Sequence, residues 1–105
     1  MELFIFKFKK LYERVKILNK KEPIPLANKV LYLMEEAGEV SVAANVIDGY
    51  KNRKVKEDVP QESMDVVLNC LLLATHFNWT YDDMIIYLDK KLKKWEDKND
   101  KTKEV

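Results

Sequence analysis

The sequence predicts an all-α protein, a four-to-five-helix bundle built by one domain spanning residues 1–105. Glycine and proline, 2 and 3 residues of 105, are too scarce for the many turns of a β-protein. Charged residues (35%) recur among the hydrophobic ones (47%) along the whole chain, which is typical of helices with one face in water. The length is enough for one modest hydrophobic core and too short for two.

Two helices are predicted before residue 50. The first covers about residues 2–20, where apolar residues recur at helical spacing: Phe4, Phe8, Leu11, Tyr12, Val15 and Leu18. Because Phe4, Phe6 and Phe8 also alternate as in a strand, the sequence does not decide the secondary structure of the first turn. Pro23 and Pro25 force a break, and the second helix then runs from about Pro25 to Gly49.

A polar, basic segment over residues 50–59 predicts a loop, followed by two more helices. Pro60 suits the first turn of the third helix, which extends to about Phe77. Thr80 followed by Asp83 is similar to a capping box, with Asp in place of Glu, and predicts a fourth helix up to about Lys98. Residues 99–105 are expected to be a frayed tail.

The third helix predicts self-association. From Val66 to Ala74 it is apolar nearly all round, and such a helix is normally buried on several sides. Four helices in one chain cannot easily surround it. We therefore expect a homo-oligomer, a dimer or a tetramer, joined through this helix and the second one.

Charge and composition exclude several classes of partner and location. Lys and Arg total 19 against 18 acids, so a net charge of +1 gives no general attraction to nucleic acid or to anionic membrane. No apolar run reaches the length of a bilayer span, and the N-terminal residues have the reverse of a signal peptide's order. A cytoplasmic protein with no nucleic-acid or membrane partner is expected.

Five carboxylates interrupt the two most apolar stretches of the chain: Glu35, Glu36, Glu39, Glu62 and Asp65. Spacings of three and four residues place Glu36 with Glu39, and Glu62 with Asp65, on one helical face each. Because burial of uncompensated carboxylates is costly, a cation should lie between these faces. An all-oxygen site favours a hard divalent ion such as Mg²⁺. The alternative to a metal site is that these acids lie on a solvated helix surface. Glu62 could also interact favourably with the helix dipole, because it lies in the first turn of its helix.

The acidic pattern resembles that of a known family. EEAGE followed by ESMD matches the E-E-x-x-E and E-x-x-D motifs of the MazG-like all-α nucleoside triphosphate pyrophosphohydrolases, and the similarity covers about residues 26–98. By position, this resemblance implies that Glu36, Glu39, Glu62 and Asp65 bind Mg²⁺, for which Mn²⁺ can substitute. It also implies that Glu35 binds a further ion or orients water, so that all five acids belong to the catalytic site.

The resemblance further implies that a nucleoside triphosphate is hydrolysed to the monophosphate and pyrophosphate, as nucleotide-pool house-cleaning. The candidates for contacting the base are polar residues of the two acidic helices: Asn28, Tyr32 and Asn69. The candidates for binding phosphate are basic residues of the loop and of the last helix: Arg53, Lys54, Lys56, Lys91 and Lys94. Phe8 and Tyr12 could stack on the base or simply pack in the core.

Two alternatives remain open. One is a non-catalytic helical module that keeps the fold and acts through partners. The other is an enzyme similar to phosphoribosyl-ATP pyrophosphohydrolase, which shares the general fold and chemistry. The sequence contains no P-loop and suggests no Ser-His-Asp arrangement.

Overall fold

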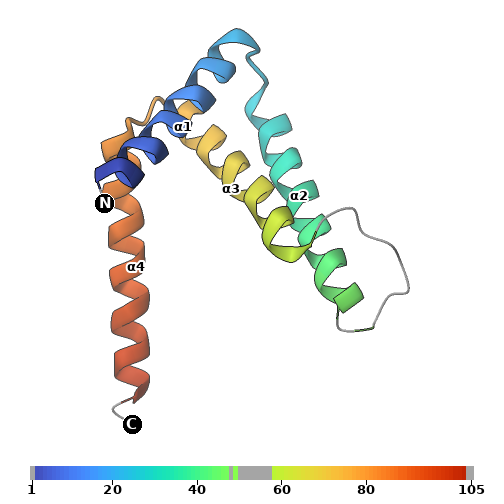
Figure 1. Ribbon diagram of the computed structural model, residues 1–105, viewed down its shortest axis with the longest axis vertical. Coiled ribbons are helices and arrows are strands. Elements are labelled where there is room, and N and C mark those ends of the chain that lie inside the picture. The colour runs from blue at the N-terminus through green and yellow to red at the C-terminus, as the bar shows by residue number, and fades with distance from the viewer. Residues whose placement is uncertain (1, 48, 50–57, 104–105) are drawn as a thin grey trace.

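The computed structural model describes residues 2–47, 49 and 58–103, which form four helices (Figure 1). In chain order these are α1 (Glu2–Lys21), α2 (Leu26–Ile47), α3 (Val59–His76) and α4 (Tyr81–Lys103). The described part of the chain contains no strand, so the all-α prediction is confirmed. The first turn of α1, left open by the alternating Phe residues, is helical.

The helices α2 and α3 lie side by side and run in opposite directions, as Figure 1 shows. The C-terminal end of α3 packs against α1, and the two helices cross at this contact. The remaining helix, α4, contacts α1 near its own N-terminus and then extends away from α2 and α3. The chain therefore has two arms that meet at α1, with principal extents of 44 × 41 × 30 Å.

The hydrophobic core lies where α1, α3 and α4 meet. Tyr12, Leu71 and Met84 are its buried residues, and Phe8 and Trp79 are among those packed around them. The Tyr12 hydroxyl donates a hydrogen bond of 2.7 Å to the backbone oxygen of Trp79, which ties α1 to the α3–α4 connection. Phe8 and Tyr12 both contact the Tyr81 ring, so their core-packing alternative is confirmed.

Local hydrogen bonds fix the ends of α3 and α4. Asp58 and Gln61 form a capping box at the start of α3, and Pro60 lies in the first turn of that helix, as predicted. At its end, Asn78 has a φ of 59°, a left-handed conformation that Asn adopts more readily than most residues. The predicted box of Thr80 and Asp83 is confirmed by two reciprocal bonds of 2.9 and 3.1 Å.

The last helix is longer than predicted, since it ends at Lys103 and not near Lys98. Residues 99–103 continue α4 as helix, and residues 104–105 lie outside the described part. The physical reason is that the sequence after Pro60 contains neither glycine nor proline, so no residue stops a helix rich in lysine and acids.

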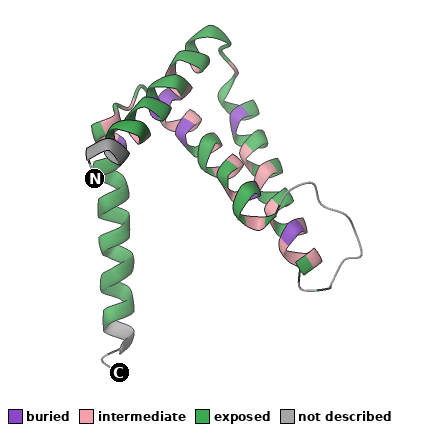
Figure 2. Cartoon of the chain, in the orientation of Figure 1, coloured by how far each residue is buried: buried purple, intermediate pink, exposed green. Residues whose placement is uncertain are grey.

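Burial is confined to the contacts between helices, and α4 is exposed over most of its length (Figure 2). Large hydrophobic side chains are exposed on all four helices, including Leu18, Met34, Met64 and Trp95. Among the described residues, no helix is both long and apolar enough to cross a membrane.

Candidate metal centre

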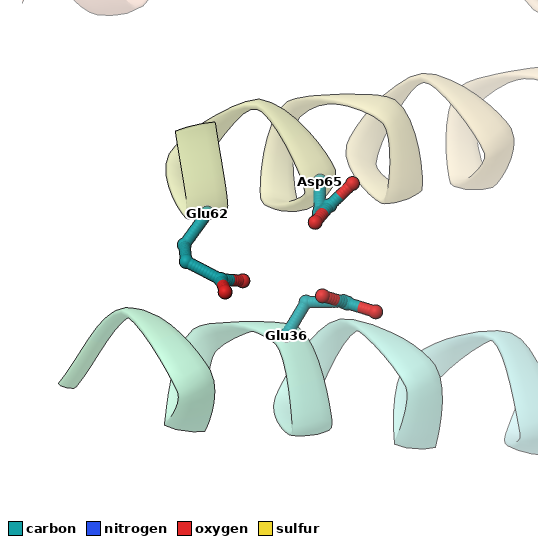
Figure 3. Close-up of side chains that lie close together, drawn as sticks. All are labelled: Glu36, Glu62 and Asp65. Atoms are coloured by element: carbon teal, nitrogen blue, oxygen red, sulfur yellow. The ribbon is translucent and has the colours of Figure 1, made fainter. Parts of the chain in front are cut away.

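Three of the five predicted carboxylates converge between α2 and α3. Glu36 extends from α2 toward Glu62 and Asp65 of α3, as Figure 3 shows. Each side chain offers one oxygen, and these three oxygens all lie within 4.8 Å of one another. Glu62 and Asp65 share a face because they are one helical turn apart, and Glu36 meets them because α2 and α3 are paired.

The neighbouring acids disfavour the ionised form of Glu36. Glu62 is 8% exposed, while Glu36 and Asp65 are half-buried. Desolvation raises the pKa of Glu36, and the neighbouring Glu39 and Asp65 raise it further. Among the described residues, no donor reaches the buried Oε2 atom of Glu36, and no Lys or Arg forms a salt bridge with Glu36 or Asp65.

The donor set fits a divalent metal ion. Three carboxylates offer hard oxygen ligands, and their negative charge compensates the positive charge of the ion. Such a site suits Mg²⁺, Mn²⁺ or Ca²⁺. A bound cation would also satisfy the buried oxygen of Glu36, which lacks a donor. The residues present therefore fit a divalent metal ion.

The other two predicted acids lie at the edge of the cluster. Glu39 is exposed, but its carboxyl group is close enough to hydrogen-bond with Glu36 and to raise the pKa of Glu36. Glu35 is also exposed and has a weaker influence of the same sign. The structure thus places Glu36 at the centre of the cluster, and Glu35 and Glu39 at its edge.

The three base-contacting candidates lie in different environments. Asn28 and Tyr32 are exposed on α2. Asn69 is half-buried one turn beyond Asp65, and its Nδ2 donates a 2.8 Å hydrogen bond to the Asp65 backbone oxygen. Asn69 also lines a cleft of about 340 Å³ between α1 and α3, together with Asn19, Glu22 and apolar side chains such as Leu18 and Leu72.

The phosphate-binding candidates are not brought to the cluster within one chain. Lys91 and Lys94 are exposed on the part of α4 that extends away from α2 and α3 (Figure 1). Arg53, Lys54 and Lys56 lie outside the described residues. Among the described residues, neither Lys91 nor Lys94 forms a salt bridge with Glu36 or Asp65.

Sequence reasoning missed one polar group, a buried lysine at the start of α2. Lys29 is 2% exposed, and its Nζ atom bonds Asn19 Oδ1 at 2.6 Å and His76 Nδ1 at 2.7 Å. These contacts join α1, α2 and α3. No local signal separates Lys29 from a surface lysine, because both partners are remote in the sequence.

Comparisons with protein-family models, with curated proteins and with solved structures found no match to this chain. The resemblance to the MazG-like enzymes therefore remains a prediction carried by the acidic motif and the helix order.

Proposed function

We propose that the protein is a Mg²⁺-dependent nucleoside triphosphate pyrophosphohydrolase. The observation that carries this proposal is the convergence of Glu36, Glu62 and Asp65 within 4.8 Å across two paired helices. The same three acids belong to the motif on which the family resemblance rests. Glu39, beside Glu36, completes the proposed ligand set.

The proposed reaction converts a nucleoside triphosphate and water into a monophosphate and pyrophosphate. The water oxygen forms a bond to the α-phosphorus, and the bond from that phosphorus to the oxygen leading to the β-phosphorus breaks. Pyrophosphate leaves with that oxygen, and the water proton passes to a carboxylate. Glu35, exposed beside the cluster, is the candidate base.

Glu36, Glu39, Glu62 and Asp65 would hold the metal. When bound there, Mg²⁺ would neutralise phosphate oxygens and stabilise the charge that develops during transfer. The protein residues bind and orient, since a phosphoryl transfer needs positioning more than covalent chemistry.

The cleft beside Asn69 supports a place for the nucleoside. It starts one helical turn from Asp65 and combines apolar walls with the amides of Asn19 and Asn69. A volume of about 340 Å³ falls within the range of small-molecule sites. In this arrangement the base enters the cleft, and the phosphates extend along α3 to the acids.

A product assay tests this proposal. The protein is incubated with a panel of canonical and modified nucleoside triphosphates and phosphoribosyl-ATP, with Mg²⁺ or Mn²⁺, and the products are identified. Monophosphate with pyrophosphate is expected. Diphosphate with orthophosphate would exclude this reaction, and preferential cleavage of phosphoribosyl-ATP would favour the related enzyme class.

Paired variants connect the activity to the cluster. Asp65→Asn should lower turnover by about 100-fold or more, because one metal-binding charge is lost. Asp97→Asn makes the same chemical change at an exposed position on α4 and should leave turnover unchanged. Equal activity of the two variants would remove Asp65 from the site.

A non-catalytic interaction module is the second candidate. It is favoured by the large hydrophobic side chains that all four helices leave exposed. Binding of Mn²⁺ to the cluster without turnover of any triphosphate in the panel would support this alternative.

A further inference from the structure

The exposed part of α4 carries a continuous apolar stripe. Ile85, Leu88, Leu92 and Trp95 follow one another at spacings of three and four residues, and their exposed fractions are 39%, 55%, 53% and 66%. The stripe continues the face through which Tyr81 packs against α1. Figure 2 shows that α4 below this contact is exposed. The described part of the chain thus covers the beginning of this face and leaves the rest in water.

The whole chain exposes more surface than a compact monomer. Its accessible surface is 8894 Å², whereas a compact monomer of 12.5 kDa exposes roughly 6,200 Å². This difference is larger than the roughly 800 Å² that each partner buries in a standard interface. The radius of gyration, 16.8 Å, likewise exceeds the roughly 13 Å expected for this length.

The stripe has the residue pattern of a two-stranded coiled coil. Ile85 and Leu92 occupy the a positions of a heptad, and Leu88 and Trp95 occupy the d positions. Among parallel coiled coils, a β-branched Ile at a with Leu at d favours two strands. Asn99 falls at the next a position, where a polar residue fixes the register of a paired helix.

Charges beside the stripe select the orientation of the paired helix. The e positions beside the stripe are acidic (Asp82, Asp89 and Glu96), the last e position is Lys103, and Lys91 and Lys98 occupy g positions. In an antiparallel pair, e faces e and g faces g, so like charges would meet. In a parallel pair, Lys91 of one copy faces Glu96 of the other, and the like-charged Lys98 and Lys103 meet only beyond the stripe. The charges that flank the stripe therefore fit a second copy of the same helix in parallel.

We propose that α4 pairs in parallel with α4 of a second copy of the chain, forming a short two-stranded coiled coil through Ile85, Leu88, Leu92 and Trp95. This inference goes beyond the proposed function and does not depend on it. It also gives the predicted homo-oligomer a contact surface other than α2 and α3.

Matched charge insertions test the surface. Leu92 and Ile86 are 53% and 52% exposed on the same helix, but Ile86 lies outside the stripe. Sedimentation or light scattering should give a dimer mass for the wild type and for Ile86→Glu, and a monomer mass for Leu92→Glu. Since neither residue belongs to the buried core, circular dichroism should show a helical fold in both variants. A monomeric wild type, or a Leu92→Glu chain that stays dimeric, would overturn the proposal.

Disulfide trapping tests the orientation. In a chain with the exposed Cys70 replaced (Cys70→Ala), Leu92→Cys should crosslink rapidly on mild oxidation, because equivalent a positions face each other in a parallel pair. Lys94→Cys, on the opposite face of α4, is the control and should not crosslink. An uncrosslinked but dimeric Leu92→Cys chain would assign the dimer to another surface, such as α2 and α3. These measurements need no substrate, so they stand or fall separately from the enzymatic proposal.

Discussion

At the scale of single residues, Glu36 connects the fold to the proposed chemistry. It is the one acid that α2 directs between Glu62 and Asp65, and its buried oxygen lacks a donor among the described residues. Desolvation and the neighbouring acids raise the pKa of its carboxyl group. The folded chain therefore holds a proton here more tightly than the unfolded chain does, and a metal ion would have to displace it.

Glu36 should make stability depend on pH in a definite direction. Because its folded-state pKa is raised above 4.5, its stabilising contribution is complete below pH 4.5 and is lost as the pH rises through the folded-state pKa. Without divalent cations, the melting temperature of the wild type should therefore fall relative to that of Glu36→Gln between pH 4 and about pH 7. Added Mg²⁺ should reverse this difference near pH 7, because the ionised carboxylate then has a partner.

Glu13→Gln is the control for this comparison, since Glu13 is an exposed acid on α1, away from the cluster. Thermal unfolding of the three proteins over the pH range, with and without Mg²⁺, is the measurement. A Glu36→Gln protein that follows the wild type under both conditions would show that Glu36 neither titrates abnormally nor binds the cation.

Lys29 should give a pH dependence of the opposite sign. Burial lowers the pKa of its ammonium group below 10.5, so the folded state releases this proton earlier than the unfolded state. The free energy of unfolding of the wild type should therefore rise relative to that of Lys29→Met as the pH approaches 10.5 from below. Denaturant titrations between about pH 7 and 9.5 measure this difference, and a constant difference would mean that the buried amine has an ordinary pKa.

At the scale of elements, the ends of the helices position the acids. The Asp58 carboxylate accepts a 3.0 Å hydrogen bond from the Gln61 backbone N–H, and the Gln61 side chain accepts one of 3.3 Å from Asp58. The next residue, Glu62, lies in the first turn that this box closes. The capping box therefore fixes the turn that presents Glu62 to α2.

Loss of this cap should weaken α3. Asp58→Ala should lower the free energy of unfolding by about 1 kcal/mol, whereas Asp58→Asn, which keeps an accepting oxygen, should lose much less. For a domain of this size, 1 kcal/mol corresponds to a fall of roughly 4–8 °C in melting temperature. Calorimetry of both variants checks the values. Equal stability of the two variants would mean that the carboxylate cap contributes nothing.

The sequence predicted those features that depend on neighbours along the chain. Helical periodicity, Pro23, Pro25 and the Thr80–Asp83 box predicted the four helices, and one-turn spacing predicted that Glu62 and Asp65 share a face. Contacts between remote segments could not be predicted in this way. The direction of α4, the choice of Glu36 over Glu35, and the burial of Lys29 by Asn19 and His76 depend on how the helices cross.

At the scale of the whole molecule, the small core explains why association matters for stability. Among the described residues, the hydrophobic core consists of Tyr12, Ala43, Leu71 and Met84, and many large apolar side chains are exposed. A core of this size supplies little free energy against the conformational entropy of about a hundred residues. A partner that covers the α4 stripe would add burial that the folded monomer lacks.

The melting temperature should therefore depend on protein concentration. If dimerisation contributes to folding, mass action predicts that each tenfold increase in concentration stabilises the native state by about 1.4 kcal/mol per dimer, and the melting temperature of the wild type should rise by a few degrees. Leu92→Glu should melt at a lower temperature that is independent of concentration, while Ile86→Glu should behave as the wild type does. Differential scanning fluorimetry over a hundredfold range of concentration makes the comparison. A wild-type melting temperature that stays constant over this range would show that the chain folds without help from a second copy.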